Sequence, residues 1–250
     1  MSTLAERRAA FRALHRSGCF VLPNPWDGGS AVRLAKAGFK ALASTSAGAA
    51  WALGKADGEM SLDEVLEHLR FLCDLTDLPV NADFEAGFAD SPSGVAQNVG
   101  RCIATGVAGL SIEDQQAGVL YPIEIAVERL RAARAAIDQS GQDVLLVGRC
   151  EAYLMQPLDA EQVITRLRAY AVAGADCLYA PGIKDIETIA RLARAVDKPL
   201  NANLTGTKLS VEDMAGVGVR RVSVGAALAK ATYDAFDGFV ARLGGQGRLP

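Results

Sequence analysis

Three acidic side chains follow two neighbouring strands predicted from apolar runs. Asp83 and Glu85 come at the end of the run that starts at Val80, and Glu113 follows the run Gly109–Ile112. Side chains two apart on an extended segment point to the same side, so we expect Asp83 and Glu85 to face one way. Three close carboxylates repel one another and raise at least one pKa, which a hard cation relieves. All-oxygen ligands favour Mg²⁺ or Mn²⁺, and this fits the three together better than unrelated solvated carboxylates do.

A charged pair ends the fifth predicted strand. Arg149 follows the apolar run Val144–Val147 and Gly148, and Glu151 lies two residues later. The guanidinium is a fork of donors that fits a carboxylate, so Arg149 is a candidate for binding an anionic substrate. A structural ion pair with Glu151 explains the same residue nearly as well, because a buried arginine needs an anionic partner. The two roles are compatible.

Small and polar residues follow the second and seventh predicted strands. Thr45, Ser46 and Ala47 begin a turn whose backbone N–H groups would suit an oxyanion, although such turns also simply close loops. Asn201 and Asn203 on the seventh strand are suited equally to donating to a ligand and to capping the next segment. These five residues are therefore candidates for binding the substrate.

All these residues need a scaffold that gathers the ends of strands. Apolar runs alternate with amphipathic segments of helical period along the chain. The eight predicted strands are Cys19–Leu22, Ala41–Ser44, Val80–Asp83, Gly109–Ile112, Val144–Val147, Cys177–Tyr179, Leu200–Ala202 and Arg221–Val224. This alternation predicts an α/β protein with one (β/α)₈ TIM-barrel domain over residues 1–250, whose strand ends carry the active site. An open doubly wound sheet is the alternative, but no GxGxxG follows the first strand.

The composition is that of a globular protein with a large core, since half of the residues are apolar and 22% are charged. A formal charge of −3 without dense runs of Lys and Arg argues against nucleic acid as a partner. The longest uncharged stretch, Ala41–Gly54, is too short for a membrane span, and no apolar signal sequence begins the chain, which predicts a cytoplasmic protein. The five cysteines form no CxxC pair, which favours reduced, buried thiols over a zinc site. His15 and His68 are the only histidines and are predicted at the surface, so a His-based zinc site or a Ser-His-Asp triad has almost no residues to form it.

Five short motifs occur in an order and spacing that resemble one enzyme family. They read NPWDGGSAVRLAKAGFKAL, STSAGAAWALGKAD, PVNADFEAGF, GLSIEDQ and VGRCEAYL. Each is moderately specific, whereas their order and spacing together are highly specific. By these motifs the chain resembles the isocitrate lyase and phosphoenolpyruvate mutase superfamily over nearly its whole length.

The resemblance implies a magnesium enzyme for a small anionic carboxylate substrate. In that family Mg²⁺ binds a 2-oxo acid or its enolate while a C–C or P–C bond is made or broken. The matching residues here are Asp57, Asp83, Glu85 and Glu113 for the metal, and Thr45, Ser46 and Arg149 for the substrate carboxylate. Family members generally form dimers or tetramers, so a homodimer or homotetramer is expected.

One loop departs from the family's lyases. Those that cleave 2-methylisocitrate or isocitrate carry a Lys-Lys/Arg-Cys-Gly-His loop after the glutamate strand, and here Asp114–Pro122 reads DQQAGVLYP, without cysteine, histidine or lysine. The longer gating loop of the mutase is missing too. The acid or base could come from elsewhere, for example from Tyr121, Tyr153 or Glu151.

Three functions remain open. The leading hypothesis is a Mg²⁺-dependent lyase or decarboxylase that breaks a C–C bond in a small 2-oxo or 2-hydroxy acid such as oxaloacetate, because decarboxylation needs an electron sink more than a proton relay. Its catalytic residues would be Glu113, Arg149 and Glu151. The second is P–C chemistry, as a phosphonopyruvate hydrolase or phosphonomutase. The third is a 2-oxo-acid-binding protein without turnover, which the reduced loop favours.

Overall fold

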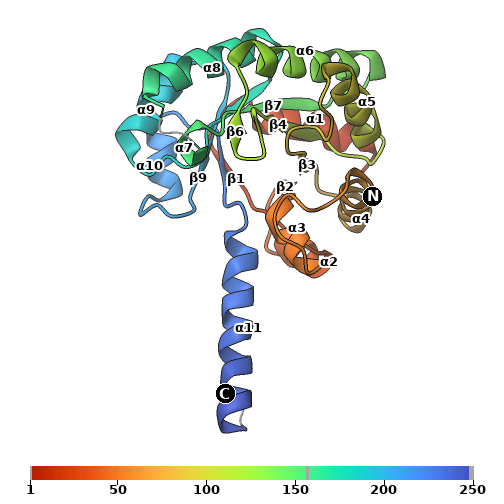
Figure 1. Ribbon diagram of the computed structural model, residues 1–250, viewed down its shortest axis with the longest axis vertical. Helices are drawn as coiled ribbons and strands as arrows, with labels where there is room; N and C mark the ends of the chain where they lie inside the picture. The colour runs from red at the N-terminus through yellow and green to blue at the C-terminus, as the bar shows by residue number, and fades with distance from the viewer. Residues whose placement is uncertain (1, 156–157, 248–250) are drawn as a thin grey trace.

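Eight parallel strands form the central sheet of the computed structural model, which describes residues 2–155 and 158–247 (Figure 1). The strands are β1 (Phe20–Leu22), β2 (Leu42–Ala43), β3 (Val80–Asp83), β4 (Gly109–Glu113), β7 (Leu145–Arg149), β8 (Cys177–Tyr179), β9 (Leu200–Asn203) and β10 (Arg221–Ser223). Their order is β1-β10-β9-β8-β7-β4-β3-β2. The N–H of Ala43 donates to the carbonyl of Pro23 at 3.0 Å, which links the two edges. The predicted (β/α)₈ barrel is confirmed, and each strand lies within two residues of its predicted bounds.

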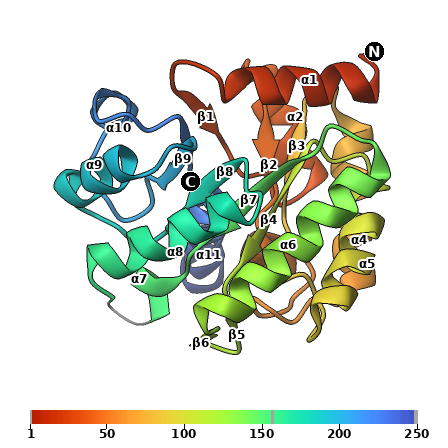
Figure 2. The ribbon, with the colours of Figure 1, turned by 90° about the horizontal axis from the view of Figure 1, so that it is seen from above.

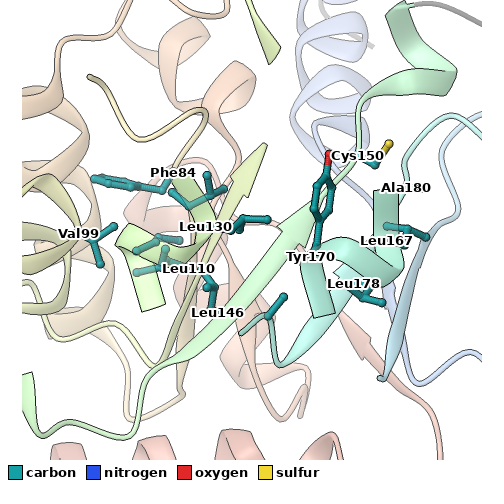
Figure 3. Close-up of a cluster of buried hydrophobic side chains, with 14 of the residues drawn as sticks. Phe84, Val99, Leu110, Leu130, Leu146, Cys150, Leu167, Tyr170, Leu178 and Ala180 are labelled. Carbon is teal, nitrogen blue, oxygen red and sulfur yellow. The ribbon is translucent and has the colours of Figure 1, made fainter. Parts of the chain in front are cut away.

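Helices surround the barrel, as Figure 2 shows. They are α1 (Leu4–Leu14), α2 (Gly28–Lys36), α3 (Ser46–Ala52), α4 (Leu62–Leu75), α5 (Pro92–Ile103), α6 (Ile123–Ser140), α7 (Ala152–Met155), α8 (Ala160–Val172), α9 (Ile186–Ala195), α10 (Val211–Gly216) and α11 (Ala227–Gln246). Their apolar faces pack on the strands in the main core, where Leu110, Leu146 and Leu130 meet (Figure 3). None of the described helices is both long and apolar enough to cross a bilayer. The cytoplasmic location stays a prediction.

Helix α1 lies across the segments that lead into β4, β7 and β8. Arg8 donates to the carbonyl oxygens of Ile103 and Val107, and the Phe11 side chain is fully buried. His15 follows α1, packs edge-on against Phe11, and is buried. The expectation of a surface histidine is therefore wrong at this position, because the sequence pattern does not show which helix face covers the barrel.

The barrel interior is polar rather than filled with branched apolar side chains. Asn81, Ser111, Asn201, Arg221 and Ser223 are all buried and line one cavity of about 190 Å³ inside the strands. The interior of such barrels is usually packed with Val, Ile and Leu. The apolar core of this protein therefore lies mainly between the sheet and its helices, and the interior is left open below the strand ends.

Candidate active site

The predicted site residues gather at the carboxyl ends of the strands. Asp83 ends β3, Glu113 ends β4 and Arg149 ends β7, and Glu113 and Arg149 are register partners. A cavity of about 760 Å³ opens beside them; Asp57, Glu85, Glu113, Arg149 and Glu151 are among its lining residues. We call this cavity the mouth. Asp83 lines the interior cavity directly beneath, together with Arg149.

Arg149 is the hub of the acidic cluster. Its Nη1 lies 2.9 Å from Asp83 Oδ1 and 3.2 Å from Glu113 Oε2, and its Nε lies 2.5 Å from Glu151 Oε1. Burial alone would lower the pKa of Arg149, but the surrounding carboxylates raise it well above its usual value. The guanidinium also lies 5.6 Å from the centre of the Tyr179 ring. The structural ion pair that the sequence suggested is present, and a grip on a substrate carboxylate stays a prediction.

Glu85 departs from its predicted backbone conformation. Strand β3 ends at Asp83, and Glu85 adopts a φ of +44° in the turn that follows, so the extended spacing argument was wrong for this pair. A positive φ is strained for a residue with a Cβ, and such strain is often found at functional sites. The carboxylate nevertheless reaches the mouth, and its Oε1 is buried without a hydrogen-bond partner.

Three of the carboxyl groups hold protons more tightly than usual. Burial, followed by the charges of Asp83 and Glu113, raises the pKa of Glu85 to about 8. Burial raises the pKa of Glu113 to about 7, although Arg149 opposes the shift. Burial also raises the pKa of Glu151. Bound protons therefore neutralise part of the negative charge of the cluster near neutral pH, in addition to Arg149.

The chemistry of this cluster fits a divalent cation. Asp57, Asp83, Glu85 and Glu113 offer only oxygen ligands, and the unpartnered Glu85 oxygen is a free ligand position. Within residues 2–155 and 158–247, however, no three such side chains stand in metal-ligand geometry, and Arg149 pairs with Asp83 and Glu113 instead. Magnesium binding at these residues stays a prediction.

The small-residue turn after β2 starts helix α3. Thr45 is the N-cap of α3, and its Oγ1 accepts a hydrogen bond from the N–H of Gly48. The N–H of Ser46 donates to Asp83 Oδ2 at 3.1 Å, and Ala47 lines the interior cavity. The turn therefore points a backbone donor at the acidic cluster, and its role in binding a substrate stays a prediction.

The two asparagines of β9 lie at different depths. Asn203 accepts from the N–H of Thr205 at 2.7 Å and donates to the Tyr179 hydroxyl at 2.9 Å, so it caps the next turn. Asn201 lies two residues deeper in the barrel and donates to Ser223 Oγ at 3.0 Å. Both asparagines line the interior cavity.

A short hairpin takes the place of the loop that carries the acid or base in the family's lyases. Strands β5 (Gln115–Gln116) and β6 (Val119–Leu120) pair antiparallel, which the sequence did not predict. Gln115 Nε2 donates to Glu113 Oε1 at 2.5 Å, and the Tyr121 hydroxyl donates to Gln116 Oε1 at 2.8 Å. Of the three alternative acids or bases, Tyr121 and Glu151 line the mouth, whereas Tyr153 does not.

Arg129 of α6 joins the loop after β3 to Tyr121, the residue that follows the hairpin. Its guanidinium donates to the backbone carbonyls of Ala86, Ala89 and Asp90 at 2.6–2.8 Å and lies 4.6 Å from the centre of the Tyr121 ring. The side chain is fully buried. Sequence reasoning missed this residue, because an arginine on an amphipathic helix is normally read as solvent-facing.

Asp114 positions Glu151 and was also missed. Its Oδ1 accepts from the N–H of Glu151 at 2.8 Å, and its Oδ2 accepts from Arg166 at 3.0 Å and from the Tyr170 hydroxyl at 2.5 Å. Asp114 is buried. Its place next to Glu113 in the motif GLSIEDQ was a signal, but its partners on α8 are not visible from sequence.

A parallel barrel with acidic side chains and an arginine at its strand ends has the arrangement of a (β/α)₈-barrel enzyme, in which the active site lies at the carboxyl ends of the strands. The family model described as phosphoenolpyruvate phosphomutase matches residues 11–243. The chain belongs to the phosphoenolpyruvate mutase and isocitrate lyase superfamily, as the motifs indicated.

Three relatives place the chain among lyases and mutases. It is 33% identical to 2-methylisocitrate lyase of Escherichia coli (strain K12) over 216 residues, which cover 82% of this chain and 72% of that protein. It is 32% identical to oxaloacetate decarboxylase of Pseudomonas putida (strain GB-1) over 247 residues, covering 92% and 83%. A solved structure described as a candidate lyase/mutase from Burkholderia cenocepacia J2315 superposes with a TM-score of 0.96 at 43% identity, covering 98% and 91%. An activity of the lyase or mutase type is therefore supported.

Proposed function

We propose that this protein is a Mg²⁺-dependent enzyme that breaks a C–C bond in a small 2-oxo or 2-hydroxy acid, with oxaloacetate as the first substrate to test. The observation that carries the proposal is Arg149 set among Asp83, Glu113 and Glu151 at the mouth. This combination suits a bound carboxylate next to a site where negative charge develops. The similarity to an oxaloacetate decarboxylase over most of both chains supports it.

Each residue has a defined task in this proposal. Arg149 and the N–H groups of the turn at Thr45–Ala47 bind the carboxylate next to the 2-oxo group. Asp57, Asp83, Glu85 and Glu113 would hold Mg²⁺, which supplies a Lewis acid for the 2-oxo oxygen. When the C–C bond breaks, its electron pair moves onto the substrate as an enolate, and a proton then returns to carbon. Glu151 and Tyr121 are the two alternative acids that line the mouth, and either would return that proton. Burial raises the pKa of Glu151, which favours its protonated form.

The test is turnover of oxaloacetate by the purified protein. We expect pyruvate and CO₂ to form in a Mg²⁺-dependent manner, at a rate within the usual enzyme range of about 1–10³ s⁻¹. EDTA should abolish the reaction. A rate no higher than that of Mg²⁺ alone would refute the decarboxylase. Phosphate release or rearrangement of phosphonopyruvate in phosphorus NMR would instead assign P–C chemistry. Stabilisation by oxalate and Mg²⁺ without turnover of either substrate would assign a binding protein.

Helix α11 supports a second proposal, that the protein is a homodimer or homotetramer. Figure 1 shows α11 extending away from the barrel. Phe236, Val240 and Leu243 on this helix are 61%, 49% and 50% exposed, which is unusual for a monomer. An apolar groove of about 620 Å³ between α2 and α11 continues the surface, with Trp26 and Leu34 in its lining. A second copy of the chain would cover this surface through a self-complementary contact.

Phe236→Glu is expected to shift the protein to a smaller species in sedimentation or light scattering. The charge would be buried against apolar side chains of the second copy, which is costly without a partner. Val172→Glu is the matched control, because Val172 is 81% exposed on α8, far along the chain from α11. A monomeric wild-type protein, or equal masses for the wild type and the Phe236 variant, would contradict the proposal.

A further inference from the structure

Arg221 is a buried cation inside the barrel without an anionic partner. It is the first residue of β10 and is 3% exposed. Its Nε donates to Asn201 Oδ1 at 2.8 Å and its Nη1 donates to Asn81 Oδ1 at 3.3 Å, so both partners are neutral amides. Across the described residues, no Asp or Glu forms an ion pair with it. A buried charge is costly unless it is paired.

One donor group of this guanidinium is available. Nη2 makes no hydrogen bond with the described residues. It is not fully buried, so a ligand or water in the cavity can reach it. Arg8 and Arg129 are equally buried, but each donates to backbone carbonyls. Arg221 differs because it lines the interior cavity and keeps a free donor there.

The interior cavity connects Arg221 with the proposed active site. Its volume is about 190 Å³, room for several waters or one small organic acid, and its lining runs from Arg221 and Asn81 to Asp83 and Arg149. Asn81 and Asp83 are two residues apart on β3, which is roughly 6–7 Å along a strand. One elongated molecule therefore reaches both levels.

We propose that the floor of the interior cavity is a carboxylate subsite, in which Arg221 binds the distal carboxylate of a dicarboxylic substrate. The inference rests on the proposed function, because the 2-oxo end of that substrate is taken to lie beside Arg149. The free Nη2 and the hydroxyl group of Ser223 supply donors, and no acidic side chain of the described chain pairs with the guanidinium. A flat carboxylate matches the guanidinium fork.

This subsite narrows the class of substrate. A ligand that fills the cavity from end to end carries one carboxylate beside Arg149 and a second beside Arg221. The preferred substrates are therefore 2-oxo or 2-hydroxy dicarboxylic acids rather than monocarboxylic acids of the same length.

The test compares two inert ligands that differ only at the distal end. 2-Oxoglutarate and 2-oxovalerate share a five-carbon 2-oxo acid chain, but only the former carries the second carboxylate. Titration calorimetry with Mg²⁺ and the full chain should give a preference for 2-oxoglutarate of about tenfold or more, the effect of one charged hydrogen bond. Arg221→Met should remove this preference and leave oxalate binding unchanged, and Arg221→Lys should keep part of it. Circular dichroism and the thermal midpoint establish that each variant is folded.

Three outcomes would overturn the subsite. They are an equal affinity of the wild type for both acids, a preference that survives in the Arg221→Met protein, and a preference lost equally in an Arg220→Met protein, whose altered side chain does not line the cavity. Inorganic phosphate that binds the wild type but not Arg221→Met, without any dicarboxylate preference, would assign a free-anion site instead. None of these readouts uses turnover, so a failed lyase assay with an intact preference would remove the proposed function and leave the subsite.

Discussion

Arg149→Lys is expected to lower kcat/KM for the cleaved 2-oxo acid by about 10²–10³-fold, the loss typical of removing an aligned donor from a site of developing charge. The Arg149 guanidinium reaches Asp83 and Glu113 through Nη1 and Glu151 through Nε. A lysine ammonium is a point charge on a flexible stem and does not reproduce this fork. Much of this loss is expected as a higher KM, because the same guanidinium binds the substrate carboxylate. Steady-state kinetics with the Mg²⁺-loaded protein measures it.

The matched control is Arg134→Lys. Arg134 forms ion pairs with Asp138 and Asp176, and neither of these acids lines the mouth. This variant should keep wild-type kinetics with a small change in thermal midpoint. If the Arg149 variant also retained kcat/KM within a few-fold while folded, Arg149 would be a structural ion-pair partner only, and the proposed binding of the substrate carboxylate would fail.

The thermal midpoint of the metal-free protein is expected to fall as pH rises from about 5 to 9. The pKa of Glu85 is raised from 4.5 to about 8, and that of Glu113 from 4.5 to about 7. At pH values between the pKa of the unfolded chain and that of the folded chain, the folded chain holds more protons than the unfolded chain. The free energy of unfolding therefore decreases as pH rises. Each 1 kcal/mol lost lowers the midpoint of a chain of this size by about 2–4 °C. Calorimetry in EDTA across this range measures it.

Magnesium should largely remove this pH dependence. A cation bound by the same carboxylates displaces their protons, so its apparent affinity rises through pH 7–8 and its stabilising effect is largest at alkaline pH. Glu85→Gln should flatten the metal-free profile and weaken Mg²⁺ binding. Glu67→Gln, an exposed position on α4, should change neither. A metal-free midpoint that is flat or rises between pH 5 and 9 would be incompatible with the acidic cluster as described.

The barrel could be predicted because its signals are local and repeated. Each strand is a short apolar run, and each run leads into a helix of clear period, so the number of strands follows without tertiary information. Strand ends such as Asp83, Glu113 and Arg149 were found for the same reason, since topology alone brings them to one end of the barrel.

The rest of the site depends on contacts between residues distant in sequence. The turn at Glu85 departs from the strand because the chain takes a positive φ there, which nothing in NADFEAG specifies. Arg129 and Arg221 look like ordinary surface arginines in sequence, yet packing buries both. The support that Asp114 gives Glu151 depends on Arg166 and Tyr170, some fifty residues further along the chain. Burial of polar groups is decided by tertiary packing and leaves little trace in local pattern.

The hairpin braced by Arg129 affects how reactants would come and go. In enzymes with a hinged lid, reopening of the lid often limits the rate of turnover. The closed lid also keeps bulk water away from the reacting carbon. Here the segment at the same place is short, paired as two strands and fixed through the Tyr121 ring to a buried guanidinium. Release would then be a matter of diffusion, insensitive to loop dynamics. A carbanion formed beneath the hairpin would be open to solvent throughout its lifetime, so Glu151 or Tyr121 would compete with water to return the proton to carbon.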